Sequence, residues 1–250
     1  MKILPGTDPS IVNDAINAVL PVMLTIACYS VYWFIAVSGK LRESISGIFN
    51  SGRAAIVQVT VKRAAGFLLL GVVPVAVCLL VFDDYSMADA GLWFNPDKTW
   101  FTVISLVLLS LVIIPVIAHN ARKPEILALY PEIRASRWTG SLLLVEIVTW
   151  ALYLFGYEVL FRGVLLFGLA KPLGPVAATA VNVILYSAAH IPKGKGETLG
   201  AIPFGMVLCV LTLVSGTIWI AFIAHLVNAV TLTFTAIKYN PGMSYAHRGK

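Results

Sequence analysis

Residues 141–170 read SLLLVEIVTWALYLFGYEVLFRGVLLFGLA, and this stretch decides what kind of protein the chain forms. It is long and apolar enough to cross a bilayer as a helix, for which about 20 such residues suffice. Yet it contains Glu158 and Arg162, one helical turn apart. A charge at the bilayer centre costs at least ~2.5–3.5 kcal/mol on insertion, so the two side chains are expected to pair on one helix face. Charges placed this way indicate a functional centre.

The composition of the whole chain agrees with a membrane setting. Of its 250 residues, 59% are hydrophobic and only 12% are charged, and the mean hydropathy is +0.88. Soluble domains have about 25% charged residues, so the sequence predicts an integral membrane protein. The formal net charge of +6 is explained by basic loops, and no nucleic-acid partner is expected. The cysteines (Cys28, Cys78 and Cys209) all lie in apolar runs and are expected to be small buried residues.

Seven apolar runs are long enough, or nearly so, to span the bilayer: about 15–38, 64–82, 99–118, 139–170, 175–191, 199–215 and 217–237. The predicted fold is therefore an all-α, polytopic membrane helix bundle of about seven transmembrane helices. Three parts are expected: N-terminal transmembrane helices with a surface segment at 1–98, a core at 99–237 and a cytoplasmic tail at 238–250. The first run lacks a basic leader and is expected to stay as a helix. Segment 41–60 is either a surface helix or a solvated connector.

The connecting loops alternate in charge. Fourteen of the 18 lysines and arginines fall in four segments: 39–63, 119–138, the loop near 192–198, and the tail from Lys238. The intervening loop, 83–98, holds four aspartates. The positive-inside rule then predicts an N-terminus outside and a C-terminus in the cytoplasm, and a bacterial inner membrane is the expected location.

Polar residues downstream can reach the depth of Glu158. A turn at 171–175 is expected to reverse the chain, which places Glu158 and His190 at depths of ~20 and ~22 Å from it at 1.5 Å per residue. His225 lies ~14 Å past a second turn, with Asn228 one turn further along the same helix. The three charged or ionisable groups converge if the second turn sits deeper than the first. The long helix at 139–170 must tilt, kink or protrude, and Gly156 is the candidate kink.

Each of these residues also has a structural interpretation. Glu158 and Arg162 could form a purely structural ion pair, and His190 could sit at the cytoplasmic interface. His225 and Asn228 could form hydrogen bonds between helices. Glu146 has no obvious partner nearby in the sequence and could either support the centre or lie near water. A shared functional centre is favoured because the structural interpretations require several independent coincidences.

The pattern excludes several kinds of centre. The chain has no HExxH metal helix, no serine in a GxSG-like setting within a span, and no pair of intramembrane aspartates. One carboxylate with two histidines remains. Such a set can activate water and stabilise an oxyanion, or hold a divalent metal at Glu158, His190 and His225. The sequence leaves that metal open and gives no evidence for another cofactor.

Three short motifs resemble the CPBP family, which groups CaaX prenyl endopeptidases with bacteriocin-processing and self-immunity proteins. They are YEVLFRG at 157–163, YSAAH at 186–190 and HLVNA at 225–229, in the family order EExxxRG, FxxxH, HxxxN. The resemblance covers roughly residues 100–237 and implies an intramembrane endopeptidase core. It also implies that the first glutamate and the middle histidine activate water, while the last histidine and asparagine hold the oxyanion.

The chain departs from that pattern at three positions. Tyr157 replaces the first glutamate, Tyr186 replaces phenylalanine, and Ala229 stands where the asparagine would be, with Asn228 one place early. A phenol is a poor general base at neutral pH, so Glu158 becomes the candidate carboxylate.

The working hypothesis is a multi-pass endopeptidase that cleaves a peptide or protein entering from the membrane or the cytoplasm. Glu158 and His190 share the water, Arg162 restrains Glu158, and His225 with Asn228 stabilises the oxyanion. The first alternative is an inactive relative that binds a peptide or a partner membrane protein. The second is a proton-coupled transporter, which an internal inverted repeat would favour.

Overall fold

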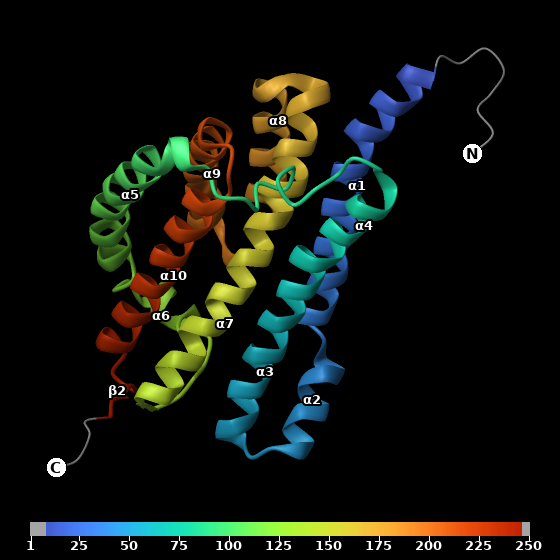
Figure 1. The fold of residues 1–250 in the computed structure, drawn as a ribbon. Helices are drawn as coiled ribbons and strands as arrows, with labels where there is room; N and C mark the ends of the chain where they lie inside the picture. Colours follow the sequence, from blue (N-terminus) through green and yellow to red (C-terminus); the bar gives the residue numbers. More distant parts are fainter. Residues whose placement is uncertain (1–8, 247–250) are drawn as a thin grey trace.

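The computed structural model describes the backbone of residues 9–246 and the side chains of residues 15–246. The extreme N-terminus, with Lys2, and the last basic residues, Arg248 and Lys250, lie outside this range. Within it the chain is a bundle of long helices, as Figure 1 shows. The prediction of an all-α, polytopic membrane bundle is confirmed.

The elements follow one another as helices with very short strands. The α-helices are α1 (Pro9–Ala36), α2 (Gly39–Ile48), α3 (Ser51–Gly66), α4 (Val73–Val81), α5 (Thr99–Asn120), α6 (Pro124–Leu129), α7 (Gly140–Glu158), α8 (Gly168–Ala188), α9 (Lys195–Ser215) and α10 (Trp219–Tyr239). Two π-helices, η1 (Phe67–Val72) and η3 (Val159–Phe167), continue α3 and α7, and the 3₁₀ turns η2 (Pro96–Lys98) and η4 (Ile191–Lys193) precede α5 and α9. Strands β1 (Arg137–Trp138) and β2 (Ser244–Tyr245) pair in parallel.

Six helical stretches of the described chain are long and apolar enough to cross a membrane. One of them, Gly140–Lys193, is 54 residues long and reverses direction at Gly174, whose φ of 78° and ψ of 162° are not helical. A positive φ costs glycine little, which is why the chain can turn sharply there. Figure 1 shows the resulting hairpin at the top of the bundle. Since this one stretch folds back on itself, its two arms count as two crossing segments. The six stretches therefore give seven crossings, the predicted number.

Segment 41–60, for which the sequence left open a surface helix or a solvated connector, is helical. Ser38 caps α2 by accepting a hydrogen bond from the Leu41 N–H, and Asn50 caps α3 in the same way through the Arg53 N–H. From Ser51 the helix runs without a break into the membrane-spanning stretch that ends at Val81. Arg63, expected to be a loop residue, is therefore buried in the bundle at 1% exposure.

Gly156 allows two helix backbones to pack closely and does not form the expected kink. A Cβ at this position would lie 2.9 Å from the Phe67 Cα, so α7 and η1 approach each other almost backbone to backbone. Small residues permit such contacts between membrane helices. The irregularity in the long helix instead begins three residues further on, in the π-helix Val159–Phe167. The expected kink at Gly156 is replaced by this π segment.

The two ends of the bundle differ in charge. In Figure 1, α2, α6 and the end of α10 lie at one end, and the turn of α8 with the acidic 83–98 loop lies at the other. The described loops rich in lysine and arginine gather at the α2 end, as alternating crossings require. The core between these ends is apolar and includes the fully buried Leu160, Leu165 and Leu169. The three cysteines are free and buried, as predicted.

Candidate functional site

Glu158 and Arg162 lie at the junction of α7 and η3, and both are completely buried. The Arg162 Nε is 3.4 Å from the Glu158 Oε2, so the expected ion pair forms. The two charged groups are in contact but not hydrogen-bonded. Among the described residues, the guanidinium nitrogens of Arg162 have no hydrogen-bond partner. Instead the Arg162 Cζ lies 4.2 Å from the centre of the Tyr186 ring. The guanidinium is therefore held by a carboxylate on one side and an aromatic face on the other.

Helix α10 brings His225 directly to this carboxylate. The His225 Nδ1 is 2.7 Å from the Glu158 Oε1, and the His225 side chain is 12% exposed. A carboxylate accepts, so Nδ1 carries the proton and Nε2 is the nitrogen left free for another group. The contact joins residues 67 positions apart in the sequence and fixes the orientation of the imidazole.

His190 lies at the end of α8, one residue before η4, and is nearly buried. Its Nδ1 is 2.8 Å from the backbone carbonyl oxygen of Tyr186. Because a carbonyl only accepts, Nδ1 is the donor, and in the neutral imidazole Nε2 is then an acceptor. This arrangement leaves His190 with a free basic nitrogen.

Tyr157 packs against both histidines. Its ring packs edge-to-face against His190 at 6.2 Å and against His225 at 5.7 Å between ring centres. Tyr186 packs against the same two rings, at 4.8 and 6.4 Å. The structure thus gathers Glu158, both histidines and both tyrosines in the bundle interior. Among the described residues, the Tyr157 hydroxyl has no hydrogen-bond partner.

The match to known proteins covers this same part of the chain. Residues 136–231 match the family model described as type II CAAX prenyl endopeptidase Rce1-like. The match supports assigning this segment to the CPBP family. It extends from the loop before α7 to the middle of α10 and so contains every residue of the centre just described. Searches of curated proteins and of solved structures find no match to the chain.

Within this CPBP segment, the third motif splits into two environments. Ala229 is 7% exposed and belongs to the buried cluster that also contains Tyr157 and Tyr186. Asn228 is only half-buried, and its side chain makes no hydrogen bond to any described residue. Helix α10 therefore turns Ala229, not the carboxamide, into the packed core beside the tyrosines.

Asn182 is a polar residue of the CPBP segment that sequence reasoning missed. It is completely buried on α8 and donates from Nδ2 to the backbone carbonyl of Phe161, within η3. Its Oδ1 accepts from the Cys209 Sγ at 3.2 Å. A π-helix changes which carbonyls are paired within the helix, and a side chain from a neighbour can complete the pairing. The signal available beforehand was a single asparagine in the apolar run 175–191.

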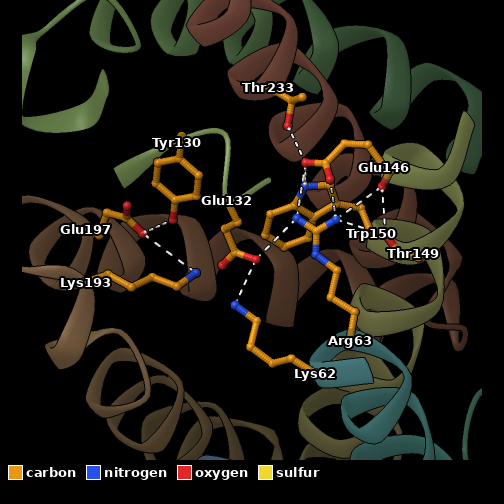
Figure 2. Close-up of polar contacts among 10 residues, drawn as sticks. All are labelled: Lys62, Arg63, Tyr130, Glu132, Glu146, Thr149, Trp150, Lys193, Glu197 and Thr233. Carbon is orange, nitrogen blue, oxygen red and sulfur yellow. Dashed lines mark hydrogen bonds and ion pairs between the residues drawn. The ribbon is translucent and has the colours of Figure 1, made fainter. Parts of the chain in front are cut away.

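A second buried polar cluster lies in the same bundle, and Figure 2 shows it. The Arg63 guanidinium binds both carboxylate oxygens of Glu146, NH1 to Oε2 at 2.7 Å and NH2 to Oε1 at 3.1 Å. The Trp150 indole donates to the same carboxylate at 2.9 Å, and its ring lies 3.9 Å from the Arg63 Cζ. Thr149 and Thr233 add further hydrogen bonds. Glu146, which had no partner in the sequence analysis, is thus fully paired.

The cluster continues to the surface through the loop before α7. Glu132 contacts the Lys62 Nζ at 2.9 Å and the Arg63 NH2 at 3.3 Å. Burial raises the pKa of Glu132, but Lys62 and Arg63 outweigh it and hold that pKa below its ordinary value. Beside it in Figure 2, the Tyr130 hydroxyl donates to Glu197, which also pairs with Lys193. The network joins α3, α7 and α10 and does not touch Glu158.

The arrangement of ligands bears on the metal that the sequence left open. In the part of the chain that the structure describes, no group of three or more histidine, cysteine, aspartate or glutamate side chains is arranged to hold a metal ion. Glu158 and His225 are in direct contact, whereas no hydrogen bond joins His190 to either of them in the described structure. The arrangement of these side chains therefore fits proton transfer better than metal binding.

Proposed function

We propose that this protein is an intramembrane endopeptidase whose centre is formed by Glu158, His190 and His225. The contact between Glu158 and His225, 2.7 Å long and buried among membrane-spanning helices, is the observation that carries the proposal. Burying a carboxylate and an imidazole among membrane-spanning helices costs desolvation free energy. This cost favours a functional role over a role in packing alone. The CPBP match over residues 136–231 supports a protease of the CAAX type as the general class.

In the proposed reaction, a water molecule attacks the carbonyl carbon of the peptide bond. The neutral His190 takes the proton of that water at Nε2, since its Nδ1–H is engaged by the Tyr186 carbonyl. The Glu158 Oε2, which has no hydrogen-bond partner among the described residues, is available to accept a hydrogen bond from the other O–H of that water. Arg162 keeps this carboxylate charged and in place.

The tetrahedral intermediate carries negative charge on the former carbonyl oxygen. Protonated His225, oriented through Nδ1 by Glu158, presents its Nε2–H as a donor to that oxyanion. Asn228, one turn along α10 and half-exposed, is the proposed second donor. When the carbon–nitrogen bond breaks, the leaving amine takes the proton from His190. No residue has to act through Tyr157 in this scheme.

An inactive, peptide-binding relative is the second candidate, and Tyr157 favours it. Its ring packs against both histidines and stands at the sequence position where the family resemblance implies a carboxylate. If this ring excludes the water, the centre can still bind an extended peptide without cleaving it.

The test is cleavage by the full-length protein reconstituted in proteoliposomes with a library of membrane-anchored peptides. We expect Glu158→Gln and His190→Ala each to lower the cleavage rate by at least ~100-fold, the scale of a lost general base. His119→Ala, an exposed histidine at the end of α5, is the matched control and should leave the rate unchanged. Peptide binding without any cleavage by the parent protein would instead favour the inactive relative.

A further inference from the structure

A groove on the charged end of the bundle is separate from the proposed centre. It has a volume of about 390 Å³ and lies between the end of α1, α2, the middle of α3 and the loop before α7. None of its lining residues belongs to the cluster around Glu158. Its lining residues belong to the elements at the α2 end of the bundle, which is the predicted cytoplasmic side.

The polar wall of this groove carries three basic side chains, Arg42, Lys62 and Arg134, against one carboxylate, that of Glu132. Glu132 is already paired with Lys62 and with the buried Arg63. Arg134 donates to the backbone carbonyls of Leu127 and Ala128, which leaves its charge uncompensated. Arg42 is exposed and forms no ion pair with any residue in the described range. The groove therefore offers two positive charges without a counter-ion.

The opposite wall is apolar and continues into the membrane-spanning part of α1. A second, open groove adjoins the first and shares Ile35, Ser38 and Leu41 with it. Its remaining lining residues are Val31 and Phe34, which are 49% and 71% exposed on the outer surface of the helix bundle. A cationic recess thus leads directly into an apolar track that faces lipid.

We propose that the joined grooves bind one anionic phospholipid from the adjacent leaflet. Its phosphate would lie between Arg42 and Arg134, and an acyl chain would follow the apolar track past Leu41 to Phe34. Basic recesses between membrane helices on the cytoplasmic side suit anionic headgroups, and each lysine or arginine near such a surface contributes about 1 kcal/mol. A zwitterionic lipid fills the same track but gains less from the two uncompensated arginines. The lipid would connect α1, α2 and the loop before α7 at one point.

The experiment titrates the purified full-length protein, in detergent, with phosphatidylglycerol or with phosphatidylcholine of the same acyl chains. Bound lipid is counted by native mass spectrometry, and the thermal unfolding midpoint is recorded in parallel. We expect one tightly retained phosphatidylglycerol, a higher unfolding midpoint with it, and weaker retention of phosphatidylcholine. Arg42→Gln should weaken phosphatidylglycerol binding about fivefold, which corresponds to ~1 kcal/mol. It breaks no side-chain hydrogen bond or ion pair in the described structure, so it should fold normally.

Controls separate this site from general surface charge and from a free-anion site. The double variant Lys40→Gln/Arg53→Gln removes two exposed basic residues at the same end outside the groove, and it should bind phosphatidylglycerol like the parent. Soluble glycerol phosphate should compete at least 100-fold more weakly than the lipid, because it lacks the acyl chain. Equal binding of the two lipids, equal loss in the control variant, equal competition by glycerol phosphate, or displacement by an uncharged lipidated peptide would each overturn the proposal.

Discussion

At the scale of single residues, the centre depends on two neighbours, Tyr157 and Glu158, whose side chains lie in different surroundings. Glu158 faces Arg162 and His225, whereas Tyr157 packs among aromatic rings and both histidines. Adjacent residues on a helix point about 100° apart, so one cannot take the place of the other without rotating the helix. The carboxylate of the centre is therefore that of Glu158, which contacts His225. It does not occupy the position of Tyr157.

Substitutions of Tyr157 separate an active centre from a blocked one. Its hydroxyl is buried and has no hydrogen-bond partner in the described structure, so Tyr157→Phe should change the free energy of unfolding by no more than about 1 kcal/mol. In an active enzyme it should also leave cleavage within about twofold. Both quantities are measured on the reconstituted protein. A large loss of cleavage with normal stability would show that the phenol itself takes part in the reaction.

At the scale of the helices, the sequence predicts the features that segment length and turn residues determine. It misses the features that depend on contacts between residues far apart in the chain. The seven crossings and the hairpin follow from apolar runs and from the Pro-Leu-Gly-Pro turn at 172–175, whose signals are local. Arg63 looked like a loop residue because its partner, Glu146, lies 83 positions away. The π-helix has no sequence signature, so the role of Asn182 beside it could not be predicted either.

The pairing of Arg63 with Glu146 can be tested by a double-mutant cycle. Arg63→Met leaves a buried carboxylate without its cation and should cost ~3–5 kcal/mol of unfolding free energy. Adding Glu146→Leu should recover most of this loss, because an apolar pair of similar volume replaces a buried ion pair at little cost. Thermal or denaturant unfolding in detergent measures the four proteins. Losses that simply add would mean that the two side chains do not interact.

The close approach of α7 and η1 makes a different prediction. Gly156→Ala places a methyl group against the Phe67 backbone and should destabilise the protein by about 1–3 kcal/mol, the usual cost of overpacking. Gly200→Ala is the matched control, since this exposed glycine of α9 has open space around it. That change should be neutral or stabilise the helix by up to about 1 kcal/mol. The same unfolding assay compares them, and a neutral Gly156→Ala would contradict the packing described here.

At the scale of the whole molecule, the two ends of the bundle have different parts in this account. The end with α2 carries the basic loops, the groove proposed to bind a phospholipid and the surface part of the Arg63 network. The centre around Glu158 is formed by α7, η3, α8 and α10. The order of the crossings was predictable, but the spatial grouping at each end depended on contacts between distant segments. How the bundle is oriented in the membrane stays a prediction from the charge of its loops.

Labelling of introduced cysteines tests that orientation. Asp84→Cys in the acidic loop should react with a membrane-impermeant thiol reagent added to intact cells, and Ser136→Cys should react only after the cells are opened. Both positions are exposed, and the native cysteines are buried, so the background should be low. Labelling of Ser136→Cys in intact cells would reverse the predicted topology.

The central claim is that Glu158 acts through His225 in one catalytic unit. The most direct measurement is kcat/KM for cleavage of a membrane-anchored peptide by the parent, Glu158→Gln, His225→Gln and the double variant in proteoliposomes. Groups that work as a unit are strongly non-additive. We predict that each single variant loses at least ~100-fold and that the double variant is no slower than the slower single variant. Additive losses, or cleavage unaffected by both substitutions, would contradict the account.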